Sequence, residues 1–175
     1  MIPFILTAVF AFIIYLLLTA GSGNLGFWSE SELIMGALLA LVTAAIARNV
    51  FCRNKNYRMA NPGRWIVLAL YLVVPFFIEM AKANLDVAYR VITGRIRPGI
   101  VKISPGLKTD LGVLILANSI TLTPGTLTVA VDEKTNDLYV HMINIPPGVE
   151  KKPVTDTRDV TAFFSFPDWI RRIAE

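Results

Sequence analysis

The sequence predicts a membrane α-helical N-terminal half, with two to three hydrophobic helices, followed by a small α/β domain that contains a β-hairpin. Of the 175 residues, 54% are hydrophobic and only 17% are charged, which is too apolar for an ordinary soluble domain. The long hydrophobic segments all lie before residue 94, and short alternating segments with Pro-Gly turns follow. We therefore expect membrane or interfacial helices in residues 1–93 and a small domain in residues 94–175.

The net charge and the low counts of cysteine and histidine argue against several classes of function. The net charge is +4, and the basic residues lie beside hydrophobic segments, which favours the lipid bilayer over nucleic acid as a partner. Cys52 is the single cysteine and His141 the single histidine, so the sequence predicts no internal disulfide, no metal site and no cofactor.

The first hydrophobic segment, residues 2–20, carries no charged side chain and is long enough to cross about 30 Å of hydrocarbon. A cleaved signal peptide would need a basic leader and a small residue where Leu18 stands, so we expect a retained helix. The second segment is residues 33–50, in which Gly36 permits close helix packing. The turn-rich link between the segments predicts a helical hairpin.

Basic residues set the expected orientation, because Lys and Arg accumulate in cytoplasmic loops. The link between the first two segments contains neither residue type. The loop after the second segment contains five basic residues and no acidic one: Arg48, Arg53, Lys55, Arg58 and Arg64. We therefore place this loop and the amino terminus in the cytoplasm.

The third segment, residues 64–93, has an apolar first half and a charged second half. Glu79, Lys82, Asp86 and Arg90 recur every three or four positions and so share one helical face. We expect a helix that lies partly in the membrane interface or packs on neighbouring subunits, with this face wet. The residues expected to turn inward are Phe77, Ile78, Ala81, Leu85 and Tyr89. A third membrane crossing is the alternative.

From Gly94 onward the pattern is that of a small α/β domain. Residues 100–104 fit a strand, and Thr109 or Asp110 fits the N-cap of an apolar helix that ends near Ile120. That helix is expected to be buried or to lie against a membrane.

A turn and a hairpin are predicted next. The sequence Thr-Pro-Gly-Thr fits a type II turn in which Pro124 fixes one dihedral angle and Gly125 supplies the positive φ. Residues 127–131 and 138–145 alternate and are expected to pair through a loop at 133–137. A last helix is expected to start near Asp156, with a break at Pro167, and to carry Phe163, Phe164, Trp169 and Ile170.

Glu79 and Lys82 are the candidates for contact with an ion route, because a carboxylate at membrane depth usually marks a functional site. The alternative is that both are interfacial charges on a wet face, since Asp86 and Arg90 continue the same stripe. The turn at Thr123 follows a helix, so the helix dipole has the wrong sign for an anion and a structural role is favoured.

His141 lies among alternating apolar residues, where a lone histidine is more often a packing residue than a base. No Ser, Cys or second His has a spacing that indicates a nucleophile partner. We therefore expect a non-catalytic protein.

Three motifs resemble the E subunit of Mrp-type (Mnh) sodium/proton antiporters. They are residues 79–87 (EMAKANLDV), the run from Asn118 to Thr126 that ends in Thr-Pro-Gly-Thr, and residues 138–144 (LYVHMIN). The resemblance covers nearly the whole chain in order and spacing. The same subunit type occurs in membrane-bound hydrogenases and related respiratory complexes, which are the alternative parent.

The resemblance implies an accessory subunit of a multisubunit cation/proton antiporter, in a prokaryotic plasma membrane and with its C-terminal domain in the cytoplasm. Its implied partners are large antiporter-like subunits and small membrane subunits. The candidate residues for function or assembly are Glu79, Lys82, Asn84, Asp86, Thr123, Pro124, Gly125, Thr126 and His141. A free membrane-anchored binding domain is the third function class.

Overall fold

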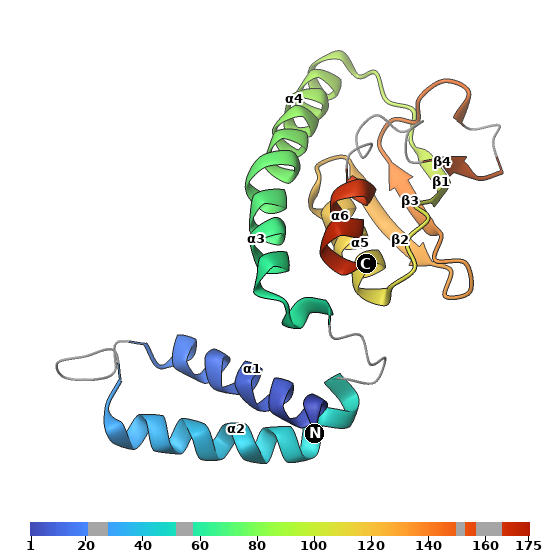
Figure 1. The fold of residues 1–175 in the computed structure, drawn as a ribbon. Coiled ribbons are helices and arrows are strands. Elements are labelled where there is room, and N and C mark those ends of the chain that lie inside the picture. The colour runs from blue at the N-terminus through green and yellow to red at the C-terminus, as the bar shows by residue number, and fades with distance from the viewer. Residues whose placement is uncertain (21–27, 52–57, 150–152, 157–165) are drawn as a thin grey trace. The chain divides into compact units, whose positions relative to one another are not determined.

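The computed structural model describes residues 1–20, 28–51, 58–149, 153–156 and 166–175. The chain divides into two compact units, Met1–Ala60 and Asn61–Glu175, and each is described by itself (Figure 1). The predicted fold class is confirmed, because apolar helices precede a small α/β region with a β-hairpin.

The N-terminal unit is a hairpin of two helices, α1 (Ile2–Leu18) and α2 (Glu30–Phe51), followed by the short 3₁₀ turn Arg58–Ala60. Ser29 and Glu32 form a reciprocal capping box at the start of α2. The Glu32 Oε2 atom accepts from the Ser29 amide at 2.7 Å, and the Ser29 Oγ atom accepts from the Glu32 amide at 3.3 Å. The helices touch at Gly36, where an added Cβ would lie 2.4 Å from the Tyr15 ring.

One long helix opens the C-terminal unit. It consists of α3 (Pro62–Tyr71), the π turn η2 (Leu72–Phe76) and α4 (Phe77–Thr93). Asn61 caps its start by accepting from the Gly63 amide at 2.9 Å. Pro75 lies in the π turn, which is a typical helical response to a missing backbone donor. Gly94 ends the helix with a φ of +67°.

A four-stranded sheet in the order β2-β3-β1-β4 follows the helix. Its strands are β1 (Gly99–Ser104), β2 (Thr126–Val131), β3 (Leu138–Met142) and β4 (Thr155–Asp156). β3 pairs antiparallel with both β1 and β2, and β4 pairs parallel with β1. The hairpin of β2 and β3 is the predicted one, with a bulge between Thr128 and Ala130.

Two further helices, α5 (Asp110–Leu122) and α6 (Phe166–Ala174), complete the unit (Figure 1). α5 packs on β2 of the sheet and on α6, and α6 packs on α3 of the long helix. Thr109 caps α5 by accepting from the Gly112 amide at 3.1 Å, as predicted. The core is made of fully buried side chains from both helices and from β1 and β3: Ile103, Leu116, Ile120, Leu138, Val140, Phe166, Ile170 and Ile173.

The expected last helix was wrong at its start. Thr155–Asp156 form strand β4, and α6 begins at Phe166. Pro167 does not break α6 but lies in its first turn, where a backbone donor has no helical partner in any case. Phe163 and Phe164 lie outside the described residues.

The expectation that one face of α4 turns inward is not met within this chain. The five residues expected inward are all exposed, because the face of α4 that meets the domain is the one carrying Val87; they are Phe77, Ile78, Ala81, Leu85 and Tyr89. The long helix belongs to the same compact unit as the sheet. The division of the chain by environment at residues 93 and 94 stays a prediction.

Candidate functional site

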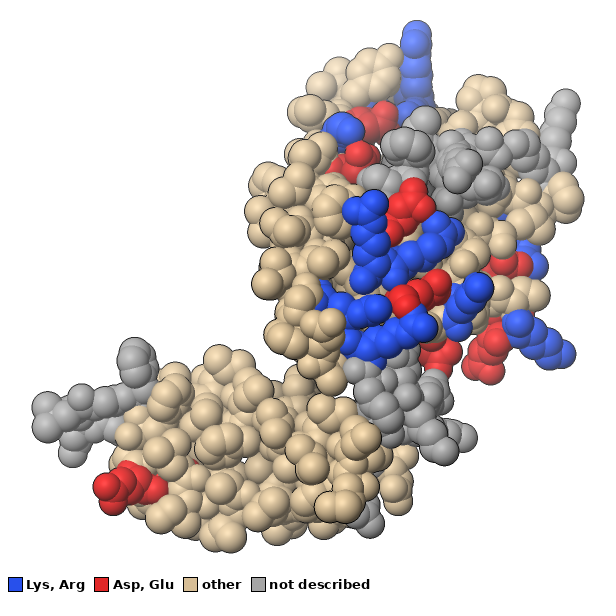
Figure 2. Space-filling view, in the orientation of Figure 1, with Lys and Arg blue, Asp and Glu red and all other residues tan. Residues whose placement is uncertain are grey.

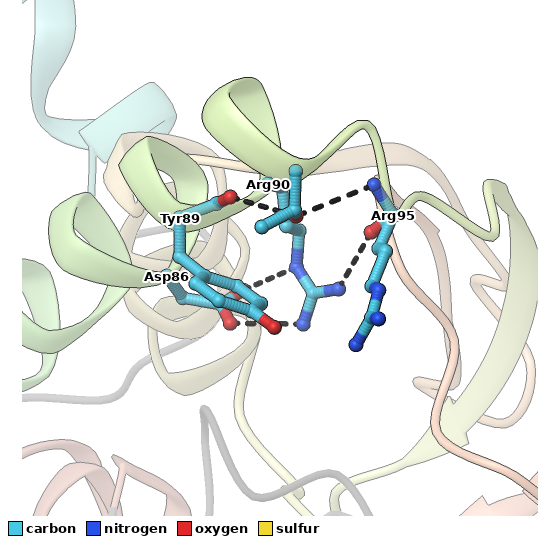
Figure 3. Close-up of polar contacts among 5 residues, drawn as sticks. Asp86, Tyr89, Arg90 and Arg95 are labelled. Atoms are coloured by element: carbon cyan, nitrogen blue, oxygen red, sulfur yellow. Dashed lines mark hydrogen bonds and ion pairs between the residues drawn. The ribbon is translucent and has the colours of Figure 1, made fainter.

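The charged stripe on α4 consists of two ion pairs within the helix. Lys82 Nζ lies 2.8 Å from Glu79 Oε1, and the Glu79 side chain is only 16% exposed while that of Lys82 is 66% exposed. Asp86 receives two bonds from Arg90, at 2.7 Å from Nε and 2.8 Å from Nη2 (Figure 3). Each carboxylate of the stripe thus has a basic partner one turn further along the helix.

The C-terminal end of α4 is organised around Arg90. Its Nη1 atom donates to the Arg95 carbonyl at 3.0 Å, so one guanidinium joins the helix to the chain that leaves it (Figure 3). The Thr93 hydroxyl donates to the Tyr89 carbonyl at 2.8 Å. A cation in the last turn also interacts favourably with the helix dipole. Asp86 and Arg90 therefore have a clear structural role.

Asn84 points back along its own helix. Its Nδ2 atom donates to the Met80 carbonyl at 2.8 Å, although the residue is exposed. This local bond uses one donor of the side-chain amide and leaves its oxygen available.

The predicted turn between α5 and β2 is confirmed. The Thr126 amide donates to the Thr123 carbonyl at 3.3 Å, and Gly125 has a φ of +86°. The two threonine hydroxyls close the end of α5, since Thr123 Oγ1 donates to the Ser119 carbonyl and Thr126 Oγ1 to that of Ile120, both at 2.7 Å. Pro124 occupies the position at which its fixed φ suits the turn.

This turn is also where α4 meets the sheet. An added Cβ on Gly125 would lie 2.9 Å from Ile143 Cγ2 and 3.1 Å from Val87 Cγ2. The Gly125 carbonyl accepts from the Ile143 amide at 2.8 Å. The structure therefore brings the Thr-Pro-Gly-Thr motif next to Val87, which adjoins Asp86 in the first motif, and next to Ile143 in the third.

His141 lies on β3 between Ile100 of β1 and Leu127 of β2. Its neighbours along the strand, Val140 and Met142, are buried, while His141 is half-buried. It therefore occupies the sheet face opposite to the core. Among the described residues, no group of three or more His, Cys, Asp or Glu is arranged to hold a metal ion.

Contacts that fasten the long helix to the domain were missed from the sequence. Tyr71 is fully buried, and its hydroxyl lies 2.7 Å from Ser119 Oγ on α5, while its ring meets Phe166 edge-on at a centroid distance of 5.7 Å. Nearer the start of α3, Arg64 Nη1 donates to the Ile173 carbonyl at 2.7 Å. These partners are 48 and 109 residues apart in the sequence, so no local pattern indicates them.

A second missed cluster links β1 to the hairpin. Lys102 Nζ lies 3.0 Å from the buried carboxylate of Asp137, which also accepts from the Thr135 hydroxyl at 2.8 Å. Burial alone would raise the pKa of Asp137, but hydrogen bonds from Ser104, Thr135 and Lys102 outweigh it and hold the pKa below its usual range. The sequence predicts only that this aspartate lies in the loop at 133–137 between two strands.

In the part of the chain that the structure describes, two helices are long and apolar enough to cross a membrane, at Glu30–Ala47 in α2 and at Pro62–Thr93 in the long helix. The 17-residue helix α1 is shorter but has no charged residue. Most large apolar side chains of α1 and α2 are exposed. The N-terminal unit therefore has the outer surface of a membrane hairpin.

Known proteins share both sequence and fold with this chain. The model of a family described as Na+/H+ ion antiporter subunit matches residues 8–161. Na+/H+ antiporter subunit E1 from Staphylococcus aureus, in strains JH9 and Newman, is 32% identical over 123 residues, which are 67% of this chain and 71% of the relative. A chain in the solved structure of the membrane-bound sulfane sulfur reductase, an archaeal respiratory membrane complex, superposes with a TM-score of 0.75 and 32% identity, covering 98% of both chains. The chain therefore belongs to the Na+/H+ ion antiporter subunit family.

Proposed function

We propose that this chain is an accessory subunit that holds a multisubunit Na+/H+ antiporter together instead of conducting ions itself. The observation that carries the proposal is the meeting of the three family-like motifs at one point, where Gly125 contacts Val87 and Ile143. The motifs that resemble those of the E subunits thus shape how the α/β domain is built and presented. Large antiporter-like subunits and small membrane subunits are the partners.

The distribution of ionisable groups supports this role. Ion transport through lipid needs a chain of buried ionisable groups, and residues 2–18 contain no Asp, Glu, Lys, Arg or His. In α4 the carboxylates of Glu79 and Asp86 each have an intrahelical basic partner. We assign both pairs to the interfacial stripe.

The proposed arrangement places the C-terminal unit in the cytoplasm. The basic residues after α2, including Arg58 before α3 and Arg64 in the first turn of α3, favour the cytoplasmic side for the start of that unit. A hairpin with both ends on the same side needs only two crossings, which are α1 and α2.

Complementation tests the proposal. In a strain that lacks this chain, the wild-type gene should restore Na+/H+ exchange in everted vesicles, and Pro124→Gly should lower the yield of assembled complex because the turn loses its fixed dihedral angle. Pro147→Gly, in an exposed loop, is the matched control and should assemble normally. Exchange by the wild-type chain purified alone would overturn the accessory role.

Glu79→Gln separates the two interpretations of the stripe. We expect an unchanged pH profile of exchange, because Glu79 is already paired with Lys82 on the helix surface. Asp86→Asn is the matched control for loss of one negative charge. A pH profile that shifts only in Glu79→Gln would assign this carboxylate to the ion route.

A redox-driven complex is the second candidate. The likeness to a chain of the archaeal respiratory complex favours it, since it covers 98% of both chains at the same 32% identity as the antiporter subunits. Iron-sulfur absorbance in the purified complex would select this parent over the antiporter.

A further inference from the structure

We propose that the long helix α3-η2-α4 does not cross the membrane but lies in the plane of its interface, with its exposed apolar face against acyl chains and anionic headgroups around it. The inference rests on the proposed membrane location. It is independent of which complex contains the chain, and it fixes two crossings instead of three.

The helix is fastened to its own α/β domain along most of its length. The contacts fall at Arg64 with Ile173, at Tyr71 with Ser119, and at Val87 with Gly125. From Arg64 to Val87 the helix rises about 34 Å, at roughly 1.5 Å per residue. This length is close to the ~30 Å thickness of the hydrocarbon core.

A helix held in this way cannot cross the bilayer without taking the domain with it. α6 packs against α3 and carries Asp168 and Arg171, whose side chains are 64% and 41% exposed. In a crossing orientation these charged side chains would enter the hydrocarbon, where ionisable residues are costly. Placing the helix flat on the membrane keeps the whole domain in water.

The face turned away from the domain is apolar from end to end. In α3 and η2 it carries Trp65, Ile66, Leu70 and Val73, and in α4 it carries Phe77, Leu85 and Ile92, all of them exposed. In Figure 2 the flank formed by α3 shows no charged residue, whereas Lys and Arg gather over α6 beside it. An exposed apolar face next to a basic polar face is the pattern of an interfacial helix.

Two features select lipid as the occupant. Ten residues, numbered 52–61, join α2 to α3 and reach about 35 Å at most, so the chain itself keeps the helix near the membrane. Basic residues lie near both ends of the apolar face, with Arg64 at one end and the exposed Arg95 at the other. Such flanking cations bind anionic headgroups.

Depth measurement on the full chain tests the inference. In a Cys52→Ser background, nitroxide labels at Val73→Cys, Leu85→Cys and Ile92→Cys are compared in vesicles of phosphatidylcholine and phosphatidylglycerol. Accessibility to lipid-soluble oxygen and to a water-soluble nickel complex should place all three labels at one shallow depth. A crossing helix would separate the first and last labels by up to about 28 Å along its axis.

Labels at two further sites calibrate the depth measurement. Val42→Cys, on the exposed surface of the α1-α2 helix pair, should report the bilayer interior, and Glu133→Cys, in the exposed loop between β2 and β3, should report water. Retention of the wild-type thermal transition checks the fold of each variant. A label at Val73 as deep as that at Val42 would overturn the in-plane helix, as would a label at Val73 that is as accessible to water as that at Glu133 or is shielded from both reagents.

Lipid composition tests the headgroup component. In vesicles of phosphatidylcholine alone the three labels should become shallower, because the flanking cations lose their anionic partners. Equal depths in both vesicle types would remove the anionic headgroups from the proposal. Since no transport is measured, these results stand apart from success or failure of the complementation test.

Discussion

The buried residues of the two compact units differ in size. In the described part of the N-terminal unit they are small, namely Thr7, Gly36, Ala40 and Ala44, and the large apolar side chains point outward. In the C-terminal unit the large side chains are inside, as Leu116, Ile120 and Phe166 are. Large apolar side chains thus form the outer surface of the N-terminal unit and the core of the C-terminal unit.

This difference indicates the solvent of each unit. In lipid, small residues at the contact let two helices approach closely, and large apolar side chains can face outward without penalty. Water drives large apolar side chains into a core. The long helix shares both properties, with one face packed on the domain and one apolar face open.

The largest expected effect comes from the core of the C-terminal unit. Leu116→Ala should destabilise this unit by about 2–5 kcal/mol, because a fully buried side chain leaves a cavity. Leu114→Ala, two residues away on α5 and 58% exposed, is the matched control and should change stability little. Urea unfolding of the full chain in detergent measures both, and equal effects would contradict the assigned core.

Gly125→Ala sharpens the comparison at the junction of α4 and the sheet. We expect a loss of roughly 1–3 kcal/mol from the strained φ, with a further loss from the contacts with Ile143 and Val87. Gly148→Ala has nearly the same φ, +87° against +86°, but its added Cβ meets no atom of the described residues within 4 Å. Gly125→Ala should lower the thermal unfolding temperature more than Gly148→Ala. The reverse order would contradict the close contact of Gly125 with Ile143 and Val87.

Gly36→Val breaks the comparison from the N-terminal side. The new side chain must displace the Tyr15 ring, and overpacking of this kind costs about 1–3 kcal/mol. Ala37→Val, on the exposed surface of α2, should be tolerated because it faces lipid. Yield and thermal stability in detergent are the measurements, and tolerance of Gly36→Val would contradict the close helix contact.

The smallest effect is a dependence on pH confined to the C-terminal unit. The pKa of Asp137 is lowered in the folded state, so its contribution is present above the unfolded value of about 3.9 and is lost as the pH falls through the folded value. Asp137→Asn should remove this acid-side loss in urea titrations between neutral pH and about pH 3. If the free energy of unfolding depends on pH in the same way in Asp137→Asn and in the wild type, Lys102 and its neighbours do not hold this carboxylate as described.

Local patterns in the sequence predict most elements of the fold. The N-cap at Thr109, the turn at Gly125 and the hairpin each depend on residues close together in the chain, and the structure confirms all three. The last helix was misplaced because Pro167 fits a helix interior poorly but a first turn well. A two-residue strand such as β4 is too short to leave an alternation pattern.

The candidate site was only partly predictable for the same reason. Sequence spacing indicates that Glu79 pairs with Lys82 and Asp86 with Arg90, since both pairs are one helical turn apart. It does not indicate that Tyr71 bonds to Ser119 or that Val87 meets Gly125, because those contacts depend on how distant elements pack. Which face of the long helix is open follows from these contacts alone.

The central claim is that a lipid-embedded hairpin carries this chain into a larger ion-translocating complex. Purification of the tagged chain from native membranes in mild detergent tests this claim most directly. Mass spectrometry should identify large polytopic membrane subunits that co-purify in fixed proportion with the wild-type chain. Recovery of the chain in the soluble fraction without detergent, or from detergent as a lone monomer, would contradict the account.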